Sequence, residues 1–286
     1  MAEEEGSEKE SNDLNEQDPT LIHYIKGLSR LQQAPGKDGY AYTALDLTNK
    51  SLERIDLIKQ YCYIQILNLS QNKIEDFSPL SELKYLVSVN IAENAIETIP
   101  TLCNVHLKAI DLTRNQITSL KDFQSDTVAN LIVTENSLQS IDGIEQLPQL
   151  TTLIASINQI SVLWSRDMDQ LPDLPLEHLE LNANALKSLH GIERFKHLKC
   201  LHLRDNQIQD VQDVSMLRPL KFLKVLDLTG NPVSEAEAYR QNIIILLSDL
   251  SILDTIPIEK EEVLTAAILK QEREAAEVNS VTNDAE

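Results

Sequence analysis

One short segment recurs along this chain and restricts what the chain can fold into. Eight copies, from LNLSQNKI at Leu67 to LDLTGNPV at Leu226, carry an asparagine at the sixth position, and an earlier copy, LDLTNKSL at Leu45, carries Lys50 there. Successive asparagines are 21 to 26 residues apart. A repeat of about this length predicts stacked coils that share one core, because a single coil cannot bury its own apolar side. The repeated asparagines are Asn72, Asn94, Asn115, Asn136, Asn158, Asn184, Asn206 and Asn231.

The chemistry of one copy predicts the shape of its coil. Alternation around Leu67 and Leu69 predicts a short strand whose leucines point inward. The asparagine that follows is expected to turn inward and bond to backbone groups of the bend and of the adjacent coil, because a buried backbone group without a partner is costly. Apolar residues at helix-like or 3₁₀-like spacing, such as Ile74 and Phe77, then cover the back. We therefore expect a parallel concave sheet and short convex segments.

The pattern LxxLxLxxN is that of leucine-rich repeats, and these copies resemble the short, 22-residue class of intracellular leucine-rich repeat proteins. The fold that this implies is an α/β solenoid of about nine coils over residues 40–233. Its core should be aliphatic, since hydrophobic residues make up 42% of the chain and aromatic residues only 4%. The closing segment, with Asn231-Pro232, Tyr239-Arg240 and Leu253-Asp254, resembles the C-terminal cap of the same class.

Both ends of an open solenoid need cover. At the front, Asp18-Pro19 is typical of a helix start, apolar residues repeat at helical spacing up to Leu31, and Pro35-Gly36 ends the run. This predicts a capping helix within residues 19–36. At the back, Ser234 is expected to cap a helix that ends at Leu247, and the C-terminal cap is expected to span 234–256.

Two acidic tails are predicted outside the caps. Residues 1–18 are expected to be disordered. Residues 257–286 are expected to be helical or disordered, with a candidate apolar stripe at Val263, Leu264, Ala267 and Ile268. Two interpretations of this second tail stay open: a solvated helix, or a helix that binds a partner protein.

Charge and composition argue against several classes of partner. The net charge of −20 opposes a broad electrostatic grip on nucleic acid or on an anionic membrane. No apolar run approaches the roughly 18 residues of a membrane span, and the acidic N-terminal segment predicts no signal peptide. Cys62, Cys103 and Cys200 form no CxxC pair, and only 7 glycines are present. We expect no cofactor, no small-molecule ligand and a reducing compartment.

Reactive side chains gather at one place in the predicted sheet. The seventh and eighth coils place His178, Cys200 and His202 on neighbouring strands, with Glu180 and Arg204 crowding the same patch. Such residues can bind metal or act as nucleophile and base, but no fourth ligand is evident and no hydrolase, kinase or metalloprotease motif occurs. The sequence therefore predicts no catalytic residue and no metal.

Protein recognition remains, on the concave face. Ile132, Ile154 and Ile157 cluster there although an exposed strand face does not require apolar residues. A binding patch and scattered surface isoleucines are both compatible with this pattern. The candidate protein-binding residues are Ile132, Ile154, Ile157, His178, His202, Arg204, Val263, Leu264, Ala267 and Ile268. The middle row of the face is expected to read Asp46, Asn68, Asn90, Asp111, Ile132, Ile154, His178, His202 and Asp227.

Some segments resemble leucine-rich repeat proteins of ciliary radial spokes more closely. They are residues 39–58 (GYAYTALDLTNKSLERIDLI), 78–86, 201–208 and 238–246, and the resemblance runs from about residue 20 to 275. It implies a non-enzymatic scaffold of the cytoplasm and cytoskeleton, in the axoneme of a motile cilium or flagellum, with other axonemal and radial-spoke proteins as partners. The wider class leaves two alternatives, a regulatory subunit of a protein phosphatase 1-type enzyme and an acidic nuclear protein that binds other proteins.

Overall fold

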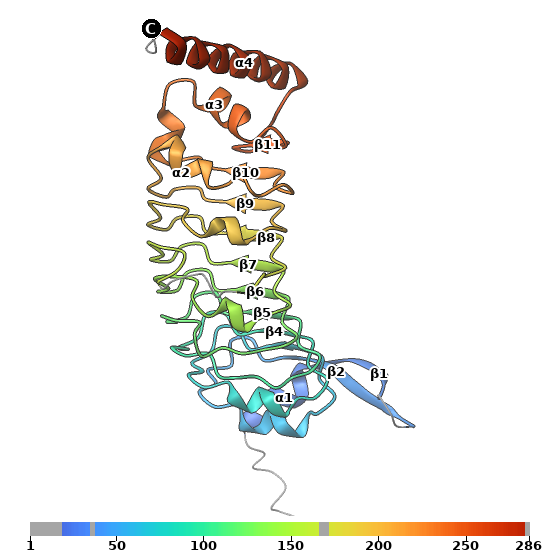
Figure 1. Ribbon diagram of the computed structural model, residues 1–286. Coiled ribbons are helices and arrows are strands. Elements are labelled where there is room, and N and C mark those ends of the chain that lie inside the picture. The colour runs from blue at the N-terminus through green and yellow to red at the C-terminus, as the bar shows by residue number, and fades with distance from the viewer. Residues whose placement is uncertain (1–18, 35–37, 166–171, 284–286) are drawn as a thin grey trace, which may run out of the picture.

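The computed structural model describes residues 19–34, 38–165 and 172–283. These residues form a column of stacked coils (Figure 1), with α1 (Pro19–Gly27) at the N-terminal end and α4 (Lys260–Asn283) lying across the C-terminal end. A two-stranded arm projects sideways from the N-terminal end. Residues 166–171, within the 26-residue step between Asn158 and Asn184, lie outside the described residues. The predicted acidic tail of residues 1–18 lies outside them too.

One sheet of 12 strands runs along the described part of the column in chain order. The strands β2 to β11 are parallel, each to the next, whereas β1 and β12 are antiparallel to their neighbours at the two ends. The predicted α/β solenoid with a parallel sheet is confirmed. The strands are β1 (Leu28–Gln33), β2 (Tyr40–Asp46), β3 (Ile66–Asn68), β4 (Ser88–Asn90), β5 (Ala109–Asp111), β6 (Asn130–Ile132), β7 (Thr152–Ile154), β8 (His178–Glu180), β9 (Cys200–His202), β10 (Val225–Asp227), β11 (Ile252–Leu253) and β12 (Ile256–Pro257).

Short helical turns and non-helical segments share the convex side, as the repeat length predicts; among the described residues, no helical turn lies between β4 and β6 or between β7 and β8. The apolar residues of this side, such as Ile74, Phe77 and Leu80 in one coil, are fully buried against the inward leucines Leu67 and Leu69. The same arrangement recurs in each coil, so the core is continuous along the column. The convex elements are η1 (Asp56–Gln60), η2 (Ser78–Glu82), η3 (Ile144–Gln146), η4 (Ile192–Arg194), α2 (Val211–Ser215) and η5 (Pro232–Glu235).

The repeated asparagines tie each coil to the one before it. In Asn115, the side-chain Nδ2 donates to the carbonyls of Leu112 in its own coil (3.0 Å) and of Ile91 in the preceding coil (3.1 Å). Its Oδ1 accepts the backbone N–H of Ile96, also in the preceding coil, at 3.1 Å. The other seven asparagines make the same backward bonds.

This backward direction explains why the first copy has lysine in place of asparagine. No coil precedes Lys50, so an amide there would have no backbone to reach. Instead, Asn72 of the second coil accepts the N–H groups of Lys50 and Leu52, each at 3.0 Å. At the other end, Asp254 accepts the N–H of Leu228 at 2.8 Å and so closes the last repeat.

The N-terminal capping helix is shorter than predicted. It ends at Gly27, and residues 28–33, expected to be helical, form strand β1 of the projecting arm. Gly27 lies where a Cβ would be 2.2 Å from the carbonyl oxygen of Asp46, so the chain crosses β2 at very close range. The chain then pairs along β2, with Leu31 opposite Tyr42.

The C-terminal cap also differs in detail. Ser234 does not cap a long helix: its hydroxyl donates to the carbonyl of Asn231 at 2.7 Å within η5. Helix α3 (Tyr239–Leu246) begins later, after Ala238 has adopted a left-handed φ of 53°. The left-handed residue turns the chain between η5 and α3, which a single capped helix could not do.

The second predicted tail forms helix α4, and an arginine holds the start of this helix to the cap. Arg240 of α3 donates to both carboxylate oxygens of Glu262, at 2.6 and 3.0 Å, and to the carbonyl of Pro257 at 3.0 Å. Ala266, one turn further along, is buried. The hydrogen bonds from Arg240 lower the pKa of Glu262 to about 2.

Replacing Glu262 with glutamine should loosen α4. Because the folded-state pKa lies below the unfolded one, the carboxylate stabilises the docked helix fully above about pH 4.5 and loses this effect as the pH falls toward about 2. Amide hydrogen exchange over α4, corrected for intrinsic rates, should be faster in Glu262→Gln than in the parent at pH 7. The two proteins should converge at low pH. The neighbouring variant Glu261→Gln is the control, and equal exchange in all three proteins at pH 7 would contradict the assignment.

Candidate interaction surface on the concave face

The register of the sheet arranges the concave side chains in rows. The middle row runs Asp46, Asn68, Asn90, Asp111, Ile132, Ile154, Glu180, His202 and Asp227. The prediction that His178 lies in this row is wrong: Glu180 is opposite Ile154, and His178 lies one row away, between Thr152 and Cys200. Glu180 is four residues before Asn184, the position that the middle-row residue has relative to each of the other repeated asparagines.

At both ends of the middle row the side chains have a local structural task. Asp111, for example, accepts the N–H of Thr113, two residues on, at 3.0 Å, and so stabilises the bend that follows its strand. Five residues of the row do this: Asp46, Asn68, Asn90, Asp111 and Asp227. The remaining four, Ile132, Ile154, Glu180 and His202, do not. At the centre of the concave face, the middle-row side chains do not make this hydrogen bond to the bend. The bend therefore does not determine which residue type occurs there.

Three isoleucines form an apolar cluster in this central part. Ile132 and Ile154 are directly opposite each other on β6 and β7, and both are partly exposed. Ile157, at the bend after β7, is 51% exposed and has a φ of 56°. A β-branched residue is strained in this left-handed conformation, by about 1–3 kcal/mol. The fold therefore does not select isoleucine at position 157, which makes this cluster a candidate contact surface.

A polar cluster lies beside the isoleucines, on β8 and β9. His178 Nε2 is 2.8 Å from Glu180 Oε1, and the rings of His178 and His202 are 5.5 Å apart. Arg204, at the next bend, is exposed and pairs with Asp205 at 3.4 Å. Burial raises the pKa of the Cys200 thiol, and the Glu180 carboxylate adds to this while Lys199 opposes it.

The stripe predicted on the second tail divides between two sides of α4. Val263 is partly buried, whereas Leu264 and Ile268 are 64% and 58% exposed and Ala267 is exposed as well. The buried Ala266 shows which side of α4 faces the cap. Leu264 and Ile268, which are one turn apart and exposed, point away from the solenoid.

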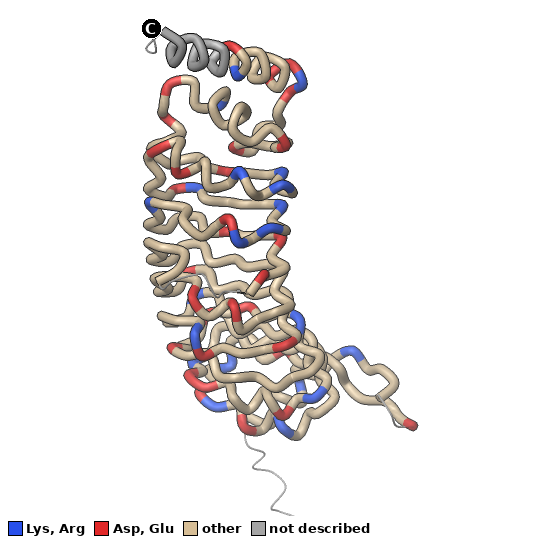
Figure 2. The backbone as a smooth tube through the Cα atoms, in the orientation of Figure 1, with Lys and Arg blue, Asp and Glu red and all other residues tan. Residues whose placement is uncertain are grey.

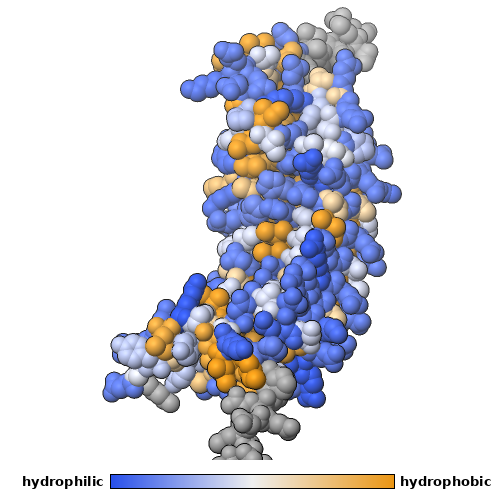
Figure 3. Space-filling view, turned by 180° about the vertical axis from the view of Figure 1, so that it is seen from behind, coloured by the Kyte–Doolittle hydropathy of each residue, from blue (hydrophilic) through white to orange (hydrophobic). Residues whose placement is uncertain are grey.

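The arm is a feature that the sequence-based predictions missed. Tyr40 is 76% exposed, and Tyr42 with its cross-strand partner Leu31 is also exposed, all on one side of the β1–β2 ribbon. Figure 3 shows hydrophobic residues on the arm and where the arm joins the column. The alternation YAYTALD could have indicated this strand, because its aromatic residues recur with a period of two.

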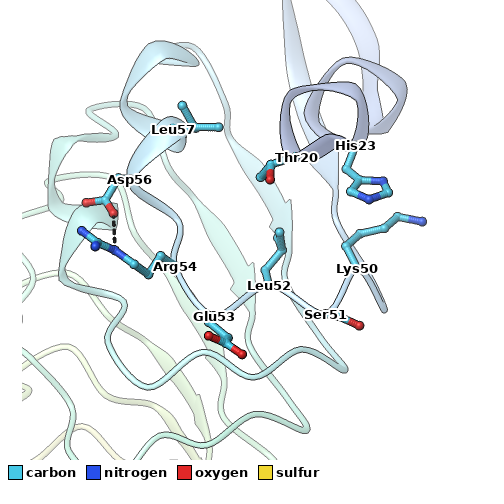
Figure 4. A pocket seen from close by; sticks show the side chains of 9 residues that line it. All are labelled: Thr20, His23, Lys50, Ser51, Leu52, Glu53, Arg54, Asp56 and Leu57. Atoms are coloured by element: carbon cyan, nitrogen blue, oxygen red, sulfur yellow. Dashed lines mark hydrogen bonds and ion pairs between the residues drawn. The ribbon is translucent and has the colours of Figure 1, made fainter. Parts of the chain in front are cut away.

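An open groove of about 580 Å³ lies between α1 and the first coil. Figure 4 shows His23 and Lys50 together on one side, whereas Arg54 pairs with Asp56 at 3.0 Å on the other. These polar groups do not converge on a common point, so the groove lacks the geometry that acid–base or nucleophilic catalysis requires.

Two further properties concern the whole described surface. Acidic and basic residues are both spread along the column, and neither sign forms one stripe over its whole length (Figure 2). None of the described helices has both the length and the apolar character that crossing a membrane requires.

Comparison with known proteins agrees with this architecture. Family models described as leucine-rich repeat match residues 165–281 and 103–120. Leucine-rich repeat-containing protein 23 of Bos taurus is 27% identical over 269 residues, which cover 86% of this chain and 78% of the relative. Human leucine-rich repeat-containing protein 51 is 33% identical over 113 residues, covering 37% of this chain and 59% of the relative.

Among solved structures, an internalin (InlF) from Listeria monocytogenes superposes with a TM-score of 0.57 at 22% identity. The match covers 74% of this chain and 61% of the internalin. At this identity the likeness concerns the fold alone. The chain is therefore a leucine-rich repeat solenoid, similar over most of its length to leucine-rich repeat-containing protein 23.

Proposed function

We propose that this chain is a non-enzymatic scaffold of the motile cilium axoneme, a radial-spoke component that holds other axonemal proteins together. The observation that carries this proposal is the resemblance of the N-terminal entry (39–58) and the cap segment (238–246) to radial-spoke leucine-rich repeat proteins. These segments lie outside the generic middle repeats. The long match to leucine-rich repeat-containing protein 23 covers a similar share of the chain and supports a protein-binding role.

The arrangement of exposed apolar groups suits a scaffold that binds more than one protein. The aromatic arm with Tyr40 and Tyr42 projects from the N-terminal end, the isoleucine cluster lies midway, and Leu264 and Ile268 lie at the C-terminal end. Patches this far apart on a rod can bind separate partners simultaneously.

Cell fractionation, followed by salt extraction of the isolated axonemes, tests the proposed location. A scaffold protein should stay with the microtubule fraction at moderate salt, because it is held by several contacts at once. A phosphatase regulator would leave with the soluble fraction in the first wash, and an acidic nuclear protein would be recovered with nuclei. Recovery of the tagged chain in either of the last two fractions would refute the proposal.

Paired variants test which surface anchors the chain. We expect Leu264→Ser/Ile268→Ser to weaken incorporation into the axoneme several-fold, because burying this exposed pair contributes about 25 cal/mol per Å². The matched variant Ile132→Ser/Ile154→Ser tests the concave face instead. Fluorescence of the tagged chain along cilia, with circular dichroism of each purified variant as the folding control, provides the measurement. Loss of incorporation only in the isoleucine variant would place the main anchor on the concave face.

Removing α4 tests whether the tail is needed for folding. Strands β11 and β12 already close the last coil, with Ile252 paired to Pro257 and the N–H of Ile258 bonded to the carbonyl of Ser251 at 2.9 Å. Deleting residues 260–286 should therefore leave a folded solenoid with a thermal midpoint lowered by only a few degrees. Cooperative unfolding lost altogether would show that α4 belongs to the core.

A further inference from the structure

His178, Glu180 and His202 bring three metal-binding groups together on the concave face. They occupy alternate positions of two adjacent parallel strands, with His178 and Glu180 on β8 and His202 opposite Glu180 on β9. The intervening Leu179 and Leu201 are fully buried, so both strands are fixed to the core. One ligand atom from each of the three side chains lies within 4.8 Å of the other two.

Ion pairing alone does not account for this cluster. The contact of 2.8 Å between His178 Nε2 and Glu180 Oε1 gives one imidazole its partner. Within the described part of the chain, neither ring nitrogen of His202 has a hydrogen-bond partner, although the ring lies 5.5 Å from that of His178. The bends after β8 and β9 do not need these side chains either, because other residues accept their N–H groups. The N–H of Arg204 donates to Asn182 Oδ1 at 2.9 Å, and the N–H of Asn182 donates to Ser156 Oγ at 3.2 Å.

We propose that His178, Glu180 and His202 bind one divalent transition-metal ion, with Zn²⁺ as the ion whose ligand preference they match. Two imidazoles and one carboxylate are a common zinc ligand set, and the nitrogen donors disfavour Ca²⁺ and Mg²⁺. Ligand atoms around a tetrahedral zinc are separated by about 3.3 Å, given bond lengths of about 2.0–2.1 Å. Partly exposed side chains reach this separation by small rotations, without movement of the strands.

The neighbouring charges favour a cation at this position. His202 lies between two carboxylates of the middle row, Glu180 on one side and Asp227 on the other. The nearby guanidinium of Arg204 is paired with Asp205. Cys200, a candidate ligand on sequence grounds, is not among the three converging side chains. A fourth ligand is not needed from this chain, because zinc sites with three protein ligands hold water or another molecule at the fourth position.

This site would lie beside the isoleucine cluster, since Glu180 is opposite Ile154. Its fourth coordination position would face the open concave surface, where a side chain of a bound protein could replace water. The proposal concerns the isolated chain and does not depend on the axonemal function.

Titration of the metal-free full-length chain with ZnCl₂ tests the site, with isothermal calorimetry as the readout. We expect one equivalent to bind. His202→Ala and Glu180→Gln each remove a direct ligand, so each should weaken binding by more than the roughly 10- to 100-fold that is typical of losing an outer-shell partner. His190→Ala, which removes a histidine outside the cluster, is the matched control and should bind as the parent does. Circular dichroism should show the same fold in every variant.

Cobalt(II) substitution identifies the ligands independently of affinity. The Co²⁺ complex should show visible bands of nitrogen and oxygen coordination without a thiolate-to-cobalt charge-transfer band, and Cys200→Ser should leave the spectrum unchanged. Three results would overturn the proposal: no binding at micromolar zinc, binding to His202→Ala and Glu180→Gln as tight as to the parent, or a spectrum that Cys200→Ser abolishes.

Discussion

Gly143→Ala is expected to destabilise the solenoid by about 3–5 kcal/mol, a large effect for the addition of a single methyl group. Gly143 precedes η3 with a φ of 109°, a conformation that residues with a Cβ rarely adopt. A Cβ at this position would also lie 2.3 Å from the carbonyl carbon and oxygen of Leu120 in the preceding coil. The contact is with backbone, so the coils would have to move apart.

Urea unfolding followed by circular dichroism measures this effect. Gly39→Ala separates the two causes, since Gly39 has a positive φ of 153° but a Cβ there would meet nothing within 4 Å. We expect a loss of about 1–3 kcal/mol for that variant, the cost of the backbone conformation alone. Equal losses in the two variants would show that backbone conformation, and not the approach of the coils, sets the requirement for glycine.

Asn115→Ala should destabilise the protein by about 3 kcal/mol. The substitution leaves the buried N–H of Ile96 without its partner, which costs about 1–3 kcal/mol. It also removes one of the two amide bonds to the carbonyl of Ile91, the other of which comes from Asn94. Asn115→Asp should be no better, because the carboxylate keeps an acceptor for Ile96 but faces the carbonyls that the amide NH₂ had satisfied. Thermal and urea unfolding of both variants check this.

Asn90→Ala is the control for the asparagine experiment. Asn90 lies on the concave face, partly exposed, and its Oδ1 accepts only the N–H of Ala92, at 2.9 Å. We expect a loss of about 0.5–1.5 kcal/mol, in the range of a single hydrogen bond. If Asn115→Ala were no more damaging than this control, the inward asparagines would not be what joins the coils.

The repeat predicted most of the fold because its physics is local. Leu67, Leu69 and Asn72 define where a coil bends and which side is buried, and the same spacing transfers to the next copy. One prediction failed although the spacing was sufficient. Glu180 lies four residues before Asn184, as Ile154 does before Asn158, so the repeat itself places Glu180 in the middle row, and the prediction of His178 there is wrong.

The ends were harder to predict for a different reason. Leu28 and Leu31 continue the helical spacing of α1, and only the close crossing of Gly27 over Asp46 forces the chain out of the helix. Such a contact depends on tertiary structure that no local pattern contains. The position of Glu180 next to both histidines likewise depends on the register between β8 and β9. From the sequence alone, Glu180 is interpreted only as a neighbour that crowds the histidines.

The backward bonds of the asparagines give the rod a direction. A coil receives amide bonds from the coil that follows it in the sequence, so losing the following coil leaves buried backbone groups unpaired. Losing the preceding coil frees the amide side chain and also backbone N–H groups, such as those of Lys108 and Gln116, which donate to carbonyls of that coil. During synthesis, each coil would therefore stay incomplete until roughly one further repeat had been made, and the rod would become fully closed only when Asp254 reached Leu228.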